Sequence, residues 1–119
     1  MKYLFLLSYD GRREDPDSVE YKQMELAYNS AIDAMAQAGV LVDCAPLQPA
    51  TTATTVRVRD GEVLLTDGPA AEIKEHVGGY TLVECADLDE ALRWAARVPA
   101  AAAGWVEVRP VVAVTPPPA

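Results

Sequence analysis

Histidine, cysteine and aromatic residues are scarce in this 119-residue chain. It has one histidine, His76, and two cysteines, Cys44 and Cys85, which lie 41 positions apart without another cysteine or a histidine near either. That spacing fits neither a zinc site nor a CxxC redox pair. We therefore expect no metal, and two reduced thiols in a cytoplasmic protein.

The motifs that bind phosphate groups or activate a serine are also missing. The sequence contains no G-x-G-x-x-G, no P-loop and no G-x-S-x-G. Each of these motifs supplies a tight backbone turn that its chemistry requires, so dinucleotide, ATP and serine-hydrolase functions are disfavoured. We expect no cofactor.

Basic residues and long apolar runs are few. The chain has 10 Lys and Arg residues and 18 Asp and Glu residues. The resulting formal net charge of -8 opposes binding to nucleic acid. The apolar run at 3–7 stops at Ser8, short of a signal peptide, and no stretch approaches the roughly 20 apolar residues that span a bilayer. Neither nucleic acid nor a membrane is an expected partner.

The remaining composition is that of one soluble globular domain. Half of the residues are hydrophobic and 24% are charged, close to the average for such domains. The length leaves no room for a second domain of ordinary size. We assign a single domain to residues 1–114 and a Pro-rich, disordered tail to residues 115–119.

Hydrophobic periodicity predicts the elements of this domain. The clearest is a hairpin, because the alternating residues 56–59 are joined to 63–65 by Asp60-Gly61, a strong turn signal. A second turn follows at 67–69. Around the hairpin we expect strands at 2–9, 40–47, 80–85 and 105–114, long helices at 19–38 and 88–98, and a short helix at 70–76 that ends before Gly78-Gly79.

This order predicts an α+β fold of the ferredoxin-like split βαβ type with an inserted β-hairpin. Both long helices should cover one face of an antiparallel sheet, with Val106 and Val108 facing them. The opposite face is then too apolar for bare solvent, so we expect a second subunit to close over it in a homodimer. The residues expected on that face are Tyr80, Leu82, Glu84, Trp105, Glu107 and Arg109.

Several segments resemble the YCII-related, or DGPF-domain, family of small bacterial proteins. They are MKYLFLLSYDG, LQPATTATTVRVRDGEVLLTDGPAAEIKEHVGGYTLVE, DLDEALRWAARVP and VEVRPV. The resemblance implies a ferredoxin-like subunit that pairs into a dimeric α/β-barrel. It also implies either an enzyme-like activity or an association with an extracytoplasmic-function sigma factor. The DGP core is intact at 67–69, but Ala70 replaces the usual Phe.

Three residues are candidate catalytic bases. His76 is the only side chain whose unperturbed pKa lies near neutrality, although a histidine near a helix end is more often structural. Asp67 stands before Gly-Pro, where it could equally organise the turn. Glu84 is a charge in a half-buried strand, where pairing with Glu107 and Arg109 is the structural alternative.

Five further residues are candidate substrate ligands. Lys74, Arg109 and Arg57 could stabilise negative charge on an oxygen, and Tyr80 and Trp105 could stack on a ring. The structural alternatives are a solvated helix face for Lys74, an ion pair for Arg109, and solvent or subunit contact for Arg57. Simple packing is the alternative for both aromatic residues.

These observations predict a dimeric protein that binds a compact cyclic or aromatic molecule. If it is an enzyme, we expect a cofactor-independent lyase or isomerase that abstracts a proton in a closed apolar cavity. The alternative is a non-catalytic ligand-binding or regulatory module associated with a sigma factor.

Overall fold

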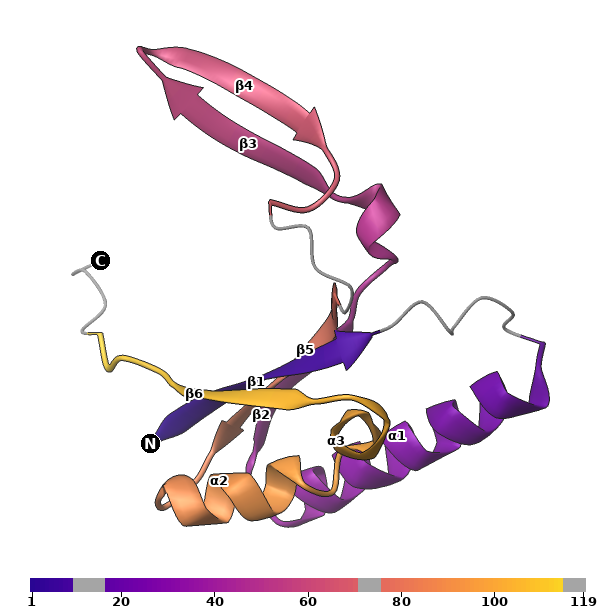
Figure 1. Ribbon diagram of the computed structural model, residues 1–119. Helices are drawn as coiled ribbons and strands as arrows, with labels where there is room; N and C mark the ends of the chain where they lie inside the picture. Colours follow the sequence, from indigo (N-terminus) through magenta and orange to yellow (C-terminus); the bar gives the residue numbers. More distant parts are fainter. Residues whose placement is uncertain (10–16, 71–75, 115–119) are drawn as a thin grey trace.

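The computed structural model describes residues 1–9, 17–70 and 76–114 (Figure 1). The expected loop at 10–16 and the tail at 115–119 lie outside these residues, as do positions 71–75 of the expected short helix. In chain order the elements are β1 (Lys2–Tyr9), α1 (Val19–Gln37), β2 (Leu41–Pro46), the 3-10 helix η1 (Ala50–Thr52), β3 (Thr54–Arg59), β4 (Glu62–Asp67), β5 (His76–Glu84), α2 (Leu88–Ala95), α3 (Pro99–Ala103) and β6 (Val106–Pro110).

Four strands form an antiparallel sheet in the order β2-β5-β1-β6, and β3 pairs only with β4 in a separate two-stranded sheet. The helices α1, α2 and α3 lie on one side of the four-stranded sheet, while the β3–β4 hairpin projects from the other side (Figure 1). The α+β class and the antiparallel sheet are thus confirmed. This strand order is consistent with a ferredoxin-like fold.

The core lies between the sheet and the helices. Strand β1 alternates so that Tyr3, Phe5 and Leu7 are buried on the helix side, as a half-buried strand requires. Val83 of β5 and Met35 of α1 pack against them, and neither side chain has any exposed surface. This small set of large side chains fixes which face of the sheet the helices cover.

Helix α1 begins where Ser18 caps it, because the Ser18 Oγ accepts a hydrogen bond from the Tyr21 N–H at 3.1 Å. It ends before Gly39, whose φ of +77° suits glycine. Its buried residues, Ala31 and Met35, both lie in the C-terminal half. The N-terminal half therefore extends beyond the sheet that the C-terminal half covers (Figure 1).

The second long helix differs from its prediction. The expected single helix over 88–98, followed by a connection at 100–104, is instead two helices, α2 and α3. The Asp87 side chain caps α2 by accepting from the Glu90 N–H at 2.9 Å. Pro99 then starts α3, because proline lacks the amide hydrogen that a helix interior requires but suits the first turn.

Strand β5 also starts earlier than expected. The short helix predicted to end at His76 is wrong at that residue, since His76 is the first residue of β5, and Gly78 and Gly79 lie inside the strand. Strand β2 approaches closely at Gly79, because a Cβ there would lie 3.0 Å from the Ala45 carbonyl oxygen, so glycine suits this position. Gly79 therefore marks a close strand contact rather than a helix end.

The last strand is shorter than predicted. It was expected over 105–114, but β6 ends at Pro110. The Val111 N–H still donates to the Lys2 carbonyl at 2.9 Å. Strand β1 begins at Lys2, so no neighbouring strand remains for further residues to pair with.

The predicted hairpin is confirmed and is longer than expected. Asp60 and Gly61 both have positive φ, at 51° and 78°, as a tight two-residue hairpin turn requires. Opposing pairs run from Arg59 with Glu62 to Thr54 with Asp67. Hydrogen bonds at its base, from the Gly68 N–H to the Ala53 carbonyl and from the Thr55 hydroxyl to the Gly68 carbonyl, are both 2.7 Å.

The predicted division of the sheet into two faces is also confirmed. In β6, Val106 and Val108 pack toward the core. On the opposite face, Leu4 of β1 lies across from Leu82 of β5, and Leu6 lies across from Tyr80. On the other side of β1, the same two leucines lie across from Arg109 and Glu107 of β6. No helix of the described chain covers this second face (Figure 1), which we call the uncovered face.

Candidate functional site

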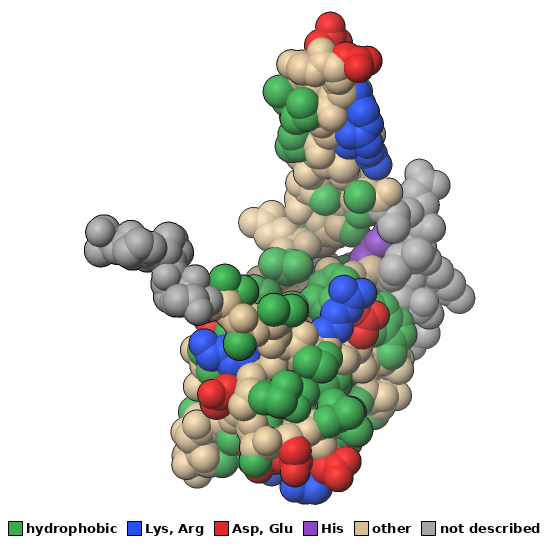
Figure 2. Space-filling model, turned by 90° about the vertical axis from the view of Figure 1, so that its left-hand side faces the viewer, with side chains coloured by type: hydrophobic (Ala, Val, Ile, Leu, Met, Phe, Trp, Pro, Cys, Tyr) green, Lys and Arg blue, Asp and Glu red, His purple; other side chains and the backbone are tan. Residues whose placement is uncertain are grey.

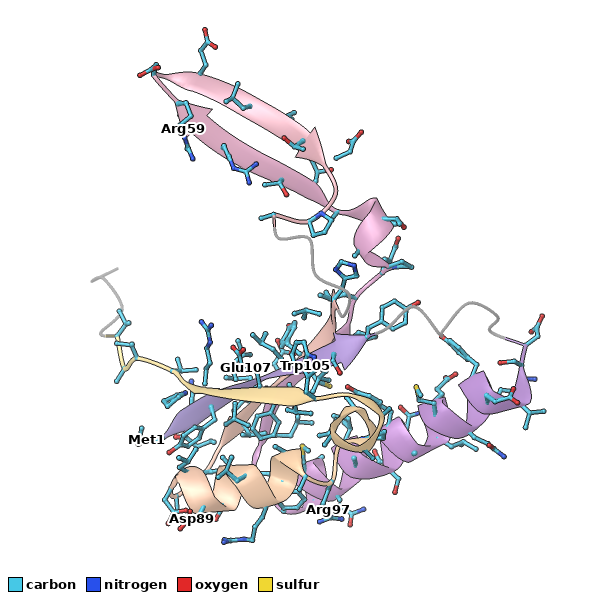
Figure 3. The ribbon with its side chains drawn as sticks, in the orientation of Figure 1. Met1, Arg59, Asp89, Arg97, Trp105 and Glu107 are labelled. Atoms are coloured by element: carbon cyan, nitrogen blue, oxygen red, sulfur yellow. The ribbon has the colours of Figure 1, made fainter. Side chains whose placement is uncertain are left out.

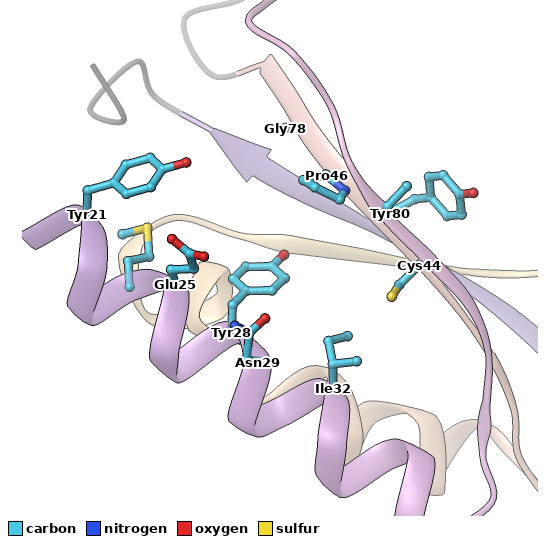
Figure 4. A pocket seen from close by; sticks show the side chains of 11 residues that line it. Tyr21, Glu25, Tyr28, Asn29, Ile32, Cys44, Pro46, Gly78 and Tyr80 are labelled. Carbon is cyan, nitrogen blue, oxygen red and sulfur yellow. The ribbon is translucent and has the colours of Figure 1, made fainter. Parts of the chain in front are cut away.

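A pocket of about 280 Å³ lies between α1 and the edge of the sheet formed by β2 and β5 (Figure 4). It exists because the N-terminal half of α1 continues past the sheet and leaves a gap along β2. Residues of one flank of the helix face this gap. The lining consists of Tyr21, Met24, Glu25, Tyr28, Asn29, Ile32, Cys44, Ala45, Pro46, Gly78 and Tyr80.

The walls of the pocket are mainly apolar, with a few polar groups among them. Tyr21, Glu25 and Tyr28 project from α1 on the side of the pocket, and the Cys44 thiol points from β2 toward Ile32 (Figure 4). Aromatic, thioether and aliphatic surface combined with a few oriented polar groups is typical of a small-molecule site. A second hollow of about 300 Å³ adjoins it, since Tyr21 and Pro46 line both.

Tyr80 contributes to the pocket wall while its ring turns away from α1 (Figure 4). Its hydroxyl donates a hydrogen bond of 2.9 Å to the Asp43 Oδ2. The pKa of Tyr80 is raised because this hydrogen bond, and next the negative charge of Asp43, disfavour the phenolate. The predicted substrate ligand Tyr80 is thus a neutral phenol fixed on the uncovered face.

The three predicted bases are not brought together. His76 and Glu84 are the first and last residues of β5. At about 3.3 Å per residue their backbones lie roughly 26 Å apart. Asp67 ends β4 in the hairpin, and the Glu84 carboxylate lies 3.5 Å from the N-terminal amine. None of the three lines the pocket beside α1. Their catalytic roles stay predictions.

The other predicted ligands are similarly dispersed. The Arg109 Nε donates to the Glu107 Oε2 at 2.6 Å, so the structural pairing expected for Arg109 is present. Figure 3 labels Glu107 on β6. The backbone N–H of Trp105 donates to the Ser8 Oγ at 2.8 Å. Arg57 lies in β3 on the hairpin, whereas Lys74 lies outside the described residues.

The residues that form the pocket were mostly missed from the sequence. Met24, Tyr28 and Ile32 belong to the apolar residues at helical spacing in the helix expected at 19–38, but Met24 is 37% exposed. The available signal was length: a helix of 19 residues has a longer apolar flank than a strand of six residues can cover. Tyr21, Met24, Glu25 and Tyr28 also share the i, i+3, i+4, i+7 spacing of one helix flank.

Two further properties of the described chain bear on function. Among residues 1–9, 17–70 and 76–114, no three His, Cys, Asp or Glu side chains are grouped so that they could hold a metal ion. None of the helices in these same ranges is long and apolar enough to cross a membrane.

Comparison with known proteins identifies the family. The profile of the YCII-related domain matches residues 1–115. The chain belongs to the YCII-related family. The uncharacterized protein R00369 of Rhizobium meliloti (strain 1021) is 44% identical over 82 residues, which cover 67% of this chain and 66% of that protein. The chain therefore spans slightly less than two thirds of the length of this relative, and the YCII-related domain accounts for nearly all of the chain.

Proposed function

We propose that this YCII-related protein binds a compact, ring-bearing small molecule in the pocket between α1 and the β2 edge. The observation that carries this proposal is the pocket itself, about 280 Å³ of space lined by two tyrosine rings, a methionine and an isoleucine. A planar ring fits such walls because aromatic and thioether contacts add to the gain from burying apolar surface.

The charge of the pocket favours a ligand with a positive substituent. Glu25 is the one carboxylate among the described lining residues, and within the described chain no ion pair engages it. The whole chain carries a formal charge of -8, which attracts cations and repels anions. Tyrosine faces also attract cations. We therefore expect an aromatic amine to bind more tightly than a neutral phenol, and an aromatic carboxylate to bind least.

The predicted proton-abstraction reaction would use Glu25 if it occurs in this pocket. Glu25 is a carboxylate beside the space in which the ring would lie. The alternative bases His76, Asp67 and Glu84 lie elsewhere in the protomer. Turnover that is lost on Glu25→Gln and kept in the triple variant His76→Ala, Asp67→Ala, Glu84→Ala would assign the base to the pocket.

Calorimetric titration of three matched ligands tests the binding proposal. Tyramine, p-cresol and 4-hydroxyphenylacetate share a phenol ring and differ in charge. For p-cresol, with eight non-hydrogen atoms at roughly 0.5 kcal/mol each, we expect a Kd of about 1 mM. Tyramine should bind several-fold more tightly, and 4-hydroxyphenylacetate more weakly.

A pair of variants on one helix supplies the control. Met24→Trp should fill the pocket and abolish binding of all three compounds. Leu26→Trp, at a position that is 69% exposed and does not line the pocket, should bind like the wild type. Equal affinity of both variants for tyramine, or no heat with any compound at saturating concentration, would refute the proposed site.

The regulatory alternative has its own test. A module associated with an extracytoplasmic-function sigma factor should co-purify with that factor, and its pocket variants should bind it unchanged. Loss of the association in Met24→Trp, but not in Leu26→Trp, would instead link the pocket to regulation.

A further inference from the structure

The second hollow adjoins the pocket beside the N-terminal half of α1. Tyr21 and Pro46 line both spaces and stand on opposite sides of the gap between helix and strand (Figure 4). The other residues that line the second hollow are Tyr9, Leu47, Gln48 and Pro49. A ligand as small as tyramine, with its ring in the pocket, leaves this second space of about 300 Å³ to be filled.

The wall of the second hollow is fixed by the protein itself. The Leu47 N–H donates to the Gly78 carbonyl at 2.9 Å, and the Pro49 carbonyl accepts from the Thr52 N–H at 2.9 Å. Pro46 and Pro49 also restrict their own backbone dihedral angles. A wall that is already ordered lowers the entropy cost of binding, so contacts made there add to affinity.

The chemistry of the second hollow suits an amide joined to an apolar side chain. Gln48 is exposed, and it forms no hydrogen bond with another residue of the described chain. Its side-chain amide can both donate to and accept from an amide of a ligand. Leu47, which is 49% exposed, and Tyr9 supply apolar surface beside it.

We propose that the ligand of the pocket is the amino-terminal aromatic residue of a short peptide whose second residue is apolar. This inference rests on the proposed function, because the ring and the amino group occupy the pocket beside Glu25. Tyr21 and Glu25 are four residues apart on α1, about 6 Å along the helix axis. Neighbouring Cα atoms of a peptide are about 3.8 Å apart, so an amino group at Glu25 brings the next side chain to Tyr21 and the second hollow.

Addition of the peptide as a further strand on β2 is disfavoured. In the four-stranded sheet β2 is an edge strand, with β5 as its neighbour. Its Cys44 N–H already donates to the Asp43 Oδ1 at 2.8 Å, and Pro46 has no N–H to donate. Strand addition depends on main-chain hydrogen bonds, so this edge favours recognition of a short peptide by side chains.

The β3–β4 hairpin takes no part in this site. It projects from the rest of the described chain (Figure 2), and none of its residues lines either hollow. Substitutions in the 47–49 segment therefore test the site without altering the hairpin.

Calorimetric titration with two isomeric dipeptide amides tests the inference. Tyrosyl-leucinamide and leucyl-tyrosinamide have the same atoms and the same charge, but only the first carries the ring on the residue that bears the free amino group. Tyrosyl-leucinamide should bind about 10-fold more tightly than either its isomer or tyramine, because it also buries part of a leucine side chain in the second hollow.

Two leucine variants locate this gain. Leu47→Trp should fill the second hollow, so that tyrosyl-leucinamide binds no more tightly than tyramine, while tyramine binds as it does to the wild type. The matched control is Leu92→Trp, at a leucine of α2 that is 46% exposed and lines neither hollow, and it should keep the tenfold difference. Gln48→Trp, at an exposed position of the same hollow, replaces Leu47→Trp if that variant misfolds.

The outcomes separate this inference from the proposed function. Equal affinity of the wild type for both dipeptide amides, or a tenfold gain that persists in folded Leu47→Trp, would overturn the inference while tyramine binding upholds the pocket. Absence of binding by tyramine and by both dipeptide amides would refute the pocket and the inference together.

Discussion

The two cysteines should differ sharply in their reactivity toward thiol reagents. Cys85 is 3% exposed and belongs to the core, whereas Cys44 is half-buried and lines the pocket. Burial, and next the neighbouring Glu90 carboxylate, raise the pKa of the Cys85 thiol from 9.0 to about 11. Because the thiolate is the reactive form, this difference alone lowers the reactive fraction at pH 8 about 100-fold.

The assay is the release of chromophore from an aromatic disulfide reagent at pH 8. Cys44→Ser isolates Cys85, and we expect its thiol to react at least about 100-fold more slowly in the folded protein than in urea. Cys85→Ser isolates Cys44 as the matched control. Its thiol should react readily, and p-cresol should slow it.

One result would refute the reasoning about the core. If Cys85 in the Cys44→Ser variant reacts as fast in buffer as in urea, its side chain does not lie between the sheet and α2. If p-cresol slows the reaction of the Cys44 thiol as much in Met24→Trp as in the wild-type pocket, the protection does not come from binding in the pocket.

Three further predictions concern stability and are measured by urea unfolding. As the pH is raised above 9, the free energy of unfolding of Cys85→Ala should fall less than that of the wild type. The raised thiol pKa contributes stability that is complete below pH 9 and lost as pH rises through about 11, worth about 3 kcal/mol; identical pH profiles would exclude this. Thr81→Val should raise stability by about 1 kcal/mol, since the fully buried Thr81 Oγ1 has no hydrogen-bond partner among the residues that the structure describes; a loss of stability would reveal a hidden partner. Gly79→Ala should cost about 1–3 kcal/mol through contact with the Ala45 carbonyl, and unchanged stability would show that β2 can shift.

The sequence was most informative where the pattern was local. Strict alternation at 56–59, followed by Asp60-Gly61, predicted the hairpin, because that turn needs two residues with positive φ. The alternation of β6 likewise predicted that Val106 and Val108 face the helices. Ser18 directly precedes α1 in the sequence, where serine is a preferred helix cap, and its hydroxyl forms the cap.

The errors arose where tertiary contact overrides local preference. Gly78-Gly79 were interpreted as a helix end, but both lie inside β5, and β2 approaches Gly79 closely. The pocket was missed because it depends on how far α1 extends past β2, which no single segment encodes. Glu84 was expected to pair with Arg109 or Glu107, but its carboxylate lies beside the N-terminal amine instead, while the expected pairing of Arg109 with Glu107 is present.

The most direct test of the account is an intermolecular nuclear Overhauser measurement between bound tyramine and the methyl groups of the protein. The account predicts contacts from the tyramine ring to the Met24 and Ile32 methyl groups on α1. Contacts to the leucines of the uncovered face instead, or none at a saturating tyramine concentration, would contradict it.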